Sequence, residues 1–217
     1  MTRPDVAPDC TKQSGYNTEE IVNILEDIFY GKCYLCEQFP LPDPEIEHFH
    51  PHSLDEAKKY EWTNLYYACS RCNSIKGTKH TNLLDCCNPE INIDDLIELS
   101  ITPYYDEDIL VAPLKNSPSD QTLNTIDLLR RCYNDAGTPL RRISRKALME
   151  NISDYHLDLL LLRKTLKNRS SGERDIIAAA DKLKAMISPK HPFSALWKTC
   201  IKRDSVLSKI AKDYNFL

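Results

Sequence analysis

The sequence predicts an α+β protein: a small domain held together by zinc, followed by a mainly α-helical C-terminal region. Two C-x-x-C pairs, Cys33–Cys36 and Cys69–Cys72, are spaced as metal ligands within the first third of the chain. The segments around them are short and interrupted by prolines. From Ser119 onward, apolar residues recur at helical spacing instead.

The bulk composition is that of an ordinary globular protein. Of 217 residues, 41% are hydrophobic and 28% are charged, which suits one compact domain or two small ones. No apolar run approaches the roughly 20 residues that a membrane span needs. The first ten residues carry prolines and acids instead of the apolar stretch of a signal peptide. We therefore expect a cytoplasmic protein that has no membrane partner.

The cysteine pattern indicates metal binding. Nine cysteines, an odd number, with two C-x-x-C pairs, fit a metal site in a reducing compartment better than a disulfide framework. Four thiolates complete a tetrahedral Zn²⁺ site with no open position, so we expect this zinc to be structural. Its ligands would be Cys33, Cys36, Cys69 and Cys72. We interpret the remaining cysteines as buried or surface thiols: Cys10, Cys86, Cys87, Cys132 and Cys200.

The first expected element is a helix over residues 17–30. Asn17, with Glu20 three residues later, resembles a capping box in which Asn replaces Ser or Thr. Apolar residues then follow at positions i, i+3, i+4 and i+7, and Gly31 supplies the stop.

The chain from residue 32 to the second cysteine pair mixes extended and helical expectations. Prolines break residues 32–52 into short extended pieces and loops. We expect a helix over about 54–62 and another from after Cys69 through Lys79. Together with the first helix, they form a domain core at residues 17–82.

A hairpin and a set of helices complete the chain. Two apolar runs, 96–101 and 109–114, lie on either side of a polar stretch and predict a hairpin or two edge strands. Charge sign and periodicity change together at 113–118, so we divide the chain into residues 1–117 and 118–217. Helices are expected from Ser119 to near Gly137, over 140–168, from Ser171 through Ile187, and from Pro192 onward.

The net charge of −4 hides a strong asymmetry. Residues 1–117 hold 9 Lys and Arg against 21 Asp and Glu, a balance of −12. Residues 118–217 hold 19 against 11, a balance of +8. A protein that binds a phosphate backbone needs local positive charge. We therefore expect the acidic half, which carries the cysteine pairs, to bind nucleic acid poorly by itself.

The loop between the cysteine pairs carries the candidate chemistry. It contains Glu47-His48-Phe49-His50-Pro51-His52 and later Asn64, and Asn73 directly follows the last cysteine. A structural zinc site alone requires none of these residues. Phosphodiester cleavage needs a base that activates water, which histidine supplies near neutral pH, and a hard cation, which carboxylate and amide oxygens hold.

Residues 31–77 resemble the HNH endonuclease motif in its zinc-bound form: C-x2-C, E-H-x-x-P, N-L, then C-x-x-C-N-x-x-K. The resemblance implies a ββα-metal fold and a metal-dependent endonuclease. It implies that His48 is the general base and that Asn64 braces the loop carrying it. Asn73, with Glu47, would bind the catalytic Mg²⁺ or Mn²⁺. Glu47 stands where Asp is commoner, and Asn73 matches the HNN variant of the motif.

The neighbouring histidines and lysines have competing interpretations. Strand alternation would place His48 and His50 on one face, so His50 is a second candidate for the base and a further candidate metal ligand. His52 is interpreted as a solvent-facing residue that starts a helix. Lys76 and Lys79 are candidate phosphate contacts, and the alternative is a solvated helix face.

A narrower resemblance involves E-H-F-x-P-x-S, W-x-N-L and the C-terminal H-P-F-S-A-L-W-K. These segments are similar to the nuclease subunit of Septu-type anti-phage defence, including retron-linked versions. The similarity implies a partner ATPase of the ABC/SMC-like class. Retron-linked versions would add a reverse transcriptase and its DNA product. The basic residues of the C-terminal region, such as the 130–131, 141–142 and 145–146 pairs, would contact either a phosphate backbone or an acidic partner, or simply cover exposed helix faces.

Two functional hypotheses from different classes follow. The first is an HNH endonuclease acting on nucleic acid, with DNA favoured over RNA such as transfer RNA, as the effector of a defence complex. The second is a catalytically inactive zinc-knuckle module that binds nucleic acid or regulates a partner ATPase. Metal-dependent cleavage that is lost in His48→Ala distinguishes the two.

Overall fold

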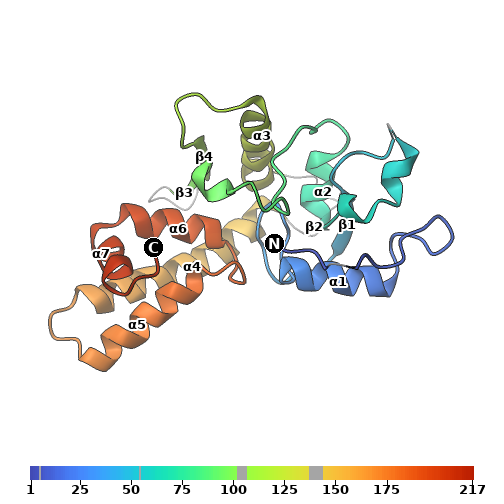
Figure 1. The fold of residues 1–217 in the computed structure, drawn as a ribbon. Coiled ribbons are helices and arrows are strands. Elements are labelled where there is room, and N and C mark those ends of the chain that lie inside the picture. The colour runs from blue at the N-terminus through green and yellow to red at the C-terminus, as the bar shows by residue number, and fades with distance from the viewer. Residues whose placement is uncertain (5, 54, 102–106, 137–143) are drawn as a thin grey trace.

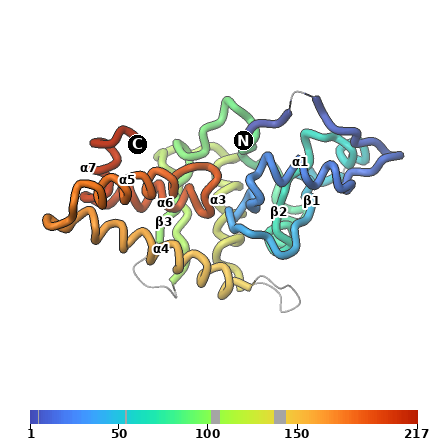
Figure 2. Tube along the Cα trace, turned by 90° about the horizontal axis from the view of Figure 1, so that it is seen from below, coloured from blue at the N-terminus to red at the C-terminus, as the bar shows by residue number. Residues whose placement is uncertain are grey.

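The computed structural model describes residues 1–217 except 5, 54, 102–106 and 137–143. The fold is α+β, with two small antiparallel sheets and a helical C-terminal part. The elements of its first part are α1 (Glu19–Phe29), β1 (Pro44–His48), β2 (Leu65–Cys69), α2 (Ser70–Lys76), β3 (Ile97–Ser100) and β4 (Leu110–Pro113). The helices that follow are α3 (Asp120–Asn134), α4 (Arg145–Lys167), α5 (Glu173–Met186), α6 (Ser194–Arg203) and α7 (Ser205–Asp213). Figures 1 and 2 show the β1–β2–α2 unit with α1 at one end, α4 to α7 at the other, and α3 between them.

Helix α1 forms where expected, but with a different cap. Thr18, not Asn17, is the N-cap, and its hydroxyl accepts a hydrogen bond from the amide of Ile21. Thr18 precedes the acids of the first turn directly, so the helix begins two residues later than predicted. Gly31 follows the helix with a φ of +67°, and a Cβ there would lie 2.8 Å from the Phe39 ring. Backbone conformation and close packing therefore both require glycine at this position.

Strands β1 and β2 pair antiparallel, with Glu47 opposite Tyr66, and α2 packs against both. The run Leu65–Cys69 is buried throughout, which fits a strand enclosed on both faces. Cys69 caps α2 through its sulfur. The helix ends at Lys76, three residues before the predicted end at Lys79, and Gly77 is its C-cap. This unit has the ββα arrangement that the resemblance implied.

Only part of the helical segment expected over about 54–62 forms, and it is 3₁₀ instead of α-helical. Two short 3₁₀ turns occupy this segment, η1 (Glu56–Lys59) and η2 (Trp62–Asn64). The carbonyl of Lys58, which a continuing helix would use within its backbone, accepts a hydrogen bond from the side chain of Asn64 instead. That contact stops the first turn before an α-helix can develop.

Strands β3 and β4 form the expected antiparallel pair, and α3 packs against β4 and α2. Tyr133 of α3 donates a hydrogen bond to the carbonyl of Cys36 at 3.1 Å. Arg71 of α2 donates to the carbonyls of Cys132 and Asp135 at the end of α3. The boundary placed between residues 117 and 118 therefore precedes a helix that packs directly on the cysteine loops.

The C-terminal helices share a core that is centred on Trp197 and Phe193, both fully buried. The last expected helix is two helices, α6 and α7, because Asp204 interrupts it. The Asp204 carboxylate accepts hydrogen bonds from the amides of Val206 and Leu207, which starts α7, and also binds Arg163 of α4.

The first cysteine loop is joined to α6 by buried polar contacts. Glu37, one residue after Cys36, accepts hydrogen bonds from the amide of Ala195 and the hydroxyl of Ser194 at 2.9 Å each. Lys32 is fully buried and donates to both Glu37 and the carbonyl of His191. The two ends of the molecule are thus connected through the loop that carries the first C-x-x-C pair.

Some expectations fall outside the described residues: the middle of the 101–109 connection, the chain after α3 near Gly137, and the basic pair 141–142. Among the helices that the structure describes, none is long and apolar enough to cross a membrane.

Candidate metal and catalytic site

The four predicted zinc ligands lie together. The sulfurs of Cys33, Cys36, Cys69 and Cys72 all lie within 4.8 Å of one another, and all four residues are buried. The Cys36 and Cys69 sulfurs are 4.0 Å apart. Tetrahedral zinc with bonds of about 2.3 Å separates its sulfurs by about 3.8 Å, so the group fits Zn²⁺.

The two loops supply their thiols in different ways. The first turns at Cys33, whose carbonyl accepts the amide of Glu37 at 2.9 Å. The second uses the end of β2 and the first turn of α2, and the amide of Cys72 donates to the Cys69 sulfur. Burial raises the pKa of Cys33, but hydrogen bonds from the other three thiols outweigh burial and hold this pKa well below its usual value. Contacts with neighbouring thiols, together with burial, raise the pKa values of Cys36 and Cys72, so zinc binding would release the protons that these thiols hold.

Glu47 lies in a buried ion pair instead of an open ligand position. One carboxylate oxygen is 2.5 Å from the Lys76 ammonium, and the other accepts a hydrogen bond from Tyr34 at 2.8 Å. Burial raises the pKa of Glu47, although Lys76 and Tyr34 act in the opposite direction. Glu47 is 3% exposed. Lys76 and Tyr34 already occupy the two oxygens that it would offer to a metal.

Lys76 differs from the expectation of a phosphate contact. Its side chain is fully buried, and besides Glu47 it donates to the carbonyl of His48 at 2.9 Å. An ammonium held in this way cannot reach a phosphate at the surface. The motif places a lysine one helical turn after Asn73, and α2 directs it into the β1–α2 interface. Lys79, beyond the end of α2, is exposed and stays a candidate contact.

Asn73 lies beside Glu45, a residue that the sequence analysis did not single out. The amide nitrogen of Asn73 donates to a carboxylate oxygen of Glu45 at 2.7 Å. Glu45 and Glu47 share one face of β1 because strand side chains alternate, and α2 packs on this face. This strand alternation is the signal in the sequence that could have identified Glu45. Its carboxylate and the Asn73 amide supply the hard oxygen donors that suit Mg²⁺ or Mn²⁺.

His48 is the last residue of β1 and its ring lies among other rings. The centroid of Tyr16 is 4.8 Å away and that of His52 is 4.6 Å away. Nε2 lies 3.1 Å from the carbonyl of Lys59, which only accepts, so Nε2 carries the proton and Nδ1 has the lone pair. Burial lowers the pKa of His48, while the Lys59 carbonyl acts in the opposite direction. The imidazole is therefore neutral at pH 7.

The loop after β1 separates the three histidines differently from simple alternation. His52, expected to face solvent, contacts the His48 ring, whereas the His50 side chain is exposed. Buried Asn64 ties this loop together. Its side chain accepts the amide of His50 at 2.6 Å and donates to the carbonyls of His50 and Lys58 at 2.9 Å each.

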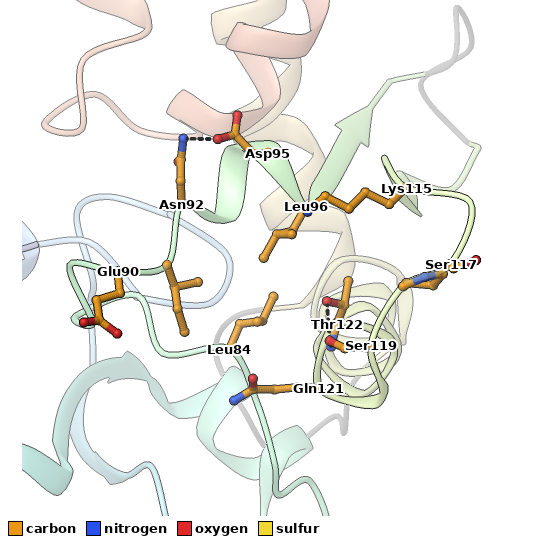
Figure 3. Close-up of a pocket in the computed structure, with 12 residues that line it drawn as sticks. Leu84, Glu90, Asn92, Asp95, Leu96, Lys115, Ser117, Ser119, Gln121 and Thr122 are labelled. Carbon is orange, nitrogen blue, oxygen red and sulfur yellow. Dashed lines mark hydrogen bonds between the residues drawn. The ribbon is translucent and has the colours of Figure 1, made fainter.

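Strand β1 joins two parts of the candidate site. One is the His48 ring at the end of the strand, and the other is the Glu45–Asn73 pair on the face of β1 that α2 covers. The hydrogen bonds of the His48 ring and of the Asn73 side chain go to different partners, the Lys59 carbonyl and Glu45. A separate cleft lies between residues 84–96 and the start of α3 (Figure 3). None of the candidate residues lines it.

Part of the chain is similar to a known protein family. The HNH endonuclease family model matches residues 33–79, a span that includes both C-x-x-C pairs, His48, Asn64 and Asn73. No curated protein and no solved structure matches the chain.

Proposed function

We propose that residues 33–79 form the catalytic centre of a metal-dependent endonuclease that hydrolyses phosphodiester bonds. The observation that carries the proposal is the state of His48 inside a segment that matches the HNH family. Its ring is neutral, and its tautomer is set by the Lys59 carbonyl. A neutral imidazole with a defined acceptor nitrogen is the form that a general base requires.

In this mechanism Nδ1 of His48 takes a proton from the water that attacks phosphorus. The Lys59 carbonyl stabilises the resulting imidazolium, since it accepts the Nε2 proton in both states. Asn64 keeps the loop in register by holding the backbone of His50. The alcohol of the cleaved strand then leaves with a proton from solvent.

Asn73 and Glu45 would hold the catalytic Mg²⁺ or Mn²⁺. When bound, the cation stabilises the negative charge that develops on the phosphate and on the leaving oxygen. Lys76 neutralises Glu47 directly behind this pair, so that two acids on one strand face are tolerated. The four-cysteine site has no open coordination position, so the zinc that it binds is structural.

The test uses purified full-length protein with plasmid DNA and with total RNA, each in Mg²⁺, in Mn²⁺ and in excess chelator. We expect cleavage that depends on the divalent ion, with DNA favoured over RNA. Asn73→Ala should lose activity and require more metal, and Glu45→Gln should shift the metal titration in the same direction. An unchanged titration in both variants would remove this pair from the metal site.

A zinc-stapled binding module without catalysis is the second candidate. The occupied oxygens of Glu47 favour it, because the motif position expected to bind metal is already paired. Binding of nucleic acid by the wild-type protein with no cleavage under any metal would support it.

The biological role that fits best is an effector of anti-phage defence that works with an ABC/SMC-like ATPase. The support is the resemblance of the histidine loop and of the C-terminal H-P-F-S-A-L-W-K segment to Septu-type nuclease subunits, together with the acidic surroundings of the site. In retron-linked versions a reverse transcriptase and its DNA product would join the complex. Affinity purification of the tagged protein from its native host, followed by identification of what co-purifies, tests this role.

A further inference from the structure

The turn at residues 85–88 gathers a second set of metal-binding atoms, distinct from the four-cysteine group. Ligand atoms of Asp85, Cys86 and Cys87 lie within 4.8 Å of one another. Both cysteines are free thiols and are half-buried. The sequence predicts only buried or surface thiols at these two positions, because adjacent cysteines have none of the usual ligand spacings.

Local hydrogen bonds build this arrangement. One oxygen of Asp85 accepts the amide of Cys87 at 2.7 Å, and the amide of Asn88 donates to the Asp85 carbonyl at 3.2 Å. The same Asp85 oxygen accepts the Tyr66 hydroxyl at 2.5 Å. Among the contacts that the structure describes, no hydrogen bond is made to the second oxygen of Asp85.

The two neighbouring thiols shift each other's pKa, and hydrogen bonding with Cys87, together with burial, raises the pKa of Cys86 well above its usual value. Hydrogen bonding from Cys86 lowers the pKa of Cys87 to about 7, burial opposes this effect, and the Arg3 guanidinium supports it. Zinc binding would displace the thiol protons of both cysteines, so the affinity should increase with pH. Arg3 itself is directed elsewhere, since it donates to the carbonyls of Trp62, Thr63 and Leu65.

We propose that Asp85, Cys86 and Cys87 form a second, exchangeable site for a borderline-soft divalent cation, with zinc as the natural occupant. Two thiolates and a carboxylate are ligands that Zn²⁺ accepts, and three protein ligands leave a fourth position for water. Such a site is open where the four-cysteine site is closed. Binding releases thiol protons and forms two metal–sulfur bonds and one metal–oxygen bond, with no change in oxidation state.

The site is coupled to the candidate catalytic unit through Tyr66. This residue lies opposite Glu47 in the β1–β2 pairing, and its ring stacks on Phe49 with centroids 4.9 Å apart. A cation on Asp85 therefore lies one hydrogen bond away from the strand that supports the histidine loop. The proposal does not depend on nuclease activity, because it concerns metal binding alone.

The experiment measures zinc in the full-length protein, prepared with reductant and then exchanged into zinc of defined concentration. We expect two equivalents per chain, the second of which is removed by a chelator concentration that leaves the first. Cys86→Ser combined with Cys87→Ser should bind one equivalent. Cys200→Ser, a matched control that removes a half-buried thiol on α6, should keep two.

Cobalt(II) and Asp85→Asn add independent readouts. Cobalt replacing the exchangeable zinc should produce sulfur-to-metal absorption that the double-serine variant lacks. Asp85→Asn keeps an oxygen that can accept the Tyr66 hydroxyl but lacks the carboxylate charge, so it should weaken the second equivalent without loss of the first. Wild-type protein that binds a single equivalent, or a second equivalent that survives in the double-serine variant, would overturn the proposal.

Discussion

At the scale of single residues, the side chain of His48 determines whether the proposed chemistry is possible. His48→Ala should reduce cleavage by roughly two to four orders of magnitude, the usual range for loss of a general base. Its ring contacts Tyr16 and His52 near the surface, so zinc content and melting temperature should change little. His50→Ala is the matched control, since its exposed ring lies two residues away. If His50→Ala were inactive and His48→Ala near wild type, the assignment of the base would be wrong.

Variants of Lys76 and Lys79 distinguish a lysine with a structural role from a lysine that binds substrate. Lys76→Met leaves the Glu47 carboxylate buried without its cation, and breaking such a pair costs about 3 kcal/mol or more. We expect a clear fall in the free energy of unfolding, measured by chemical denaturation. Lys79→Ala removes an exposed side chain and should leave stability unchanged while it weakens nucleic-acid binding in a salt-dependent way. Equal stability of the two variants would contradict the buried pair.

The site residues show what sequence can and cannot predict at this scale. The four cysteines were predictable because C-x-x-C spacing is itself a geometric constraint. The surroundings of Glu47 were not, because its partner Lys76 is 29 residues away and only the packing of α2 on β1 brings them together. Glu45 was predictable in principle from strand alternation. His52 was not, because the turn at Pro51 breaks that alternation and returns the chain to His48.

At the scale of elements, the zinc loops support more than the ββα unit. Zinc binding is coupled to folding, so Cys72→Ser or strong chelation should unfold residues 31–77. Tyr133 of α3 binds the carbonyl of Cys36, and Glu37 caps the start of α6, so these helices should lose protection as well. Hydrogen exchange followed by mass spectrometry measures this spread. Exchange confined to residues 31–77 would mean that the helical part folds independently.

The packing of α4 on α6 predicts a pH-dependent stability. Burial lowers the pKa of His156, whose ring is nearly parallel to that of Trp197, with centroids 6.4 Å apart. The unfolded chain therefore binds more protons than the folded chain below the ordinary histidine pKa of about 6.5. Stability should be full above that pH and fall as the pH drops through the folded value. His156→Gln should show a smaller decrease in melting temperature between pH 7.5 and pH 5.5 than the wild type and His50→Gln; parallel curves would contradict it.

Elements with strong local signals were predictable, and those set by distant contacts were not. Helices α3, α4 and α5 follow their apolar periodicity, and Ser119 caps α3 as its position indicates. The α6–α7 break was missed because the interrupting Asp204 also pairs with Arg163, 41 residues earlier. The segment at residues 54–62 contains good helix formers, yet Asn64 takes the carbonyl that a helix would need.

At the scale of the whole molecule, the acidic and basic halves neutralise each other in part. Lys198 and Arg203 of α6 pair with Asp94, just before β3, and with Glu98 of β3, and Arg145 pairs with Asp108 at 3.1 Å. Arg130 donates to the carbonyl of Val111. Several of the cations that sequence alone offered to a phosphate backbone are therefore engaged within the protein.

This internal pairing sharpens the expectation for the isolated protein. The half that carries the candidate site has a balance of −12, so a polyanion approaches it against electrostatic repulsion. The +8 of residues 118–217 is spread over about a hundred residues, and several of its cations are paired within the protein. The isolated protein should bind nucleic acid with a dissociation constant of about 10⁻⁶ M or weaker at physiological salt, as measured by fluorescence anisotropy.

Binding should tighten by at least tenfold when the proposed ATPase partner is added, and removal of residues 145–217 should abolish that gain if the helical end is the docking surface. Since Glu37 and Lys32 tie this end to the first cysteine loop, zinc content is measured on the truncated protein first. Efficient binding and degradation of DNA at physiological salt by the full-length protein alone would remove the physical reason for a partner.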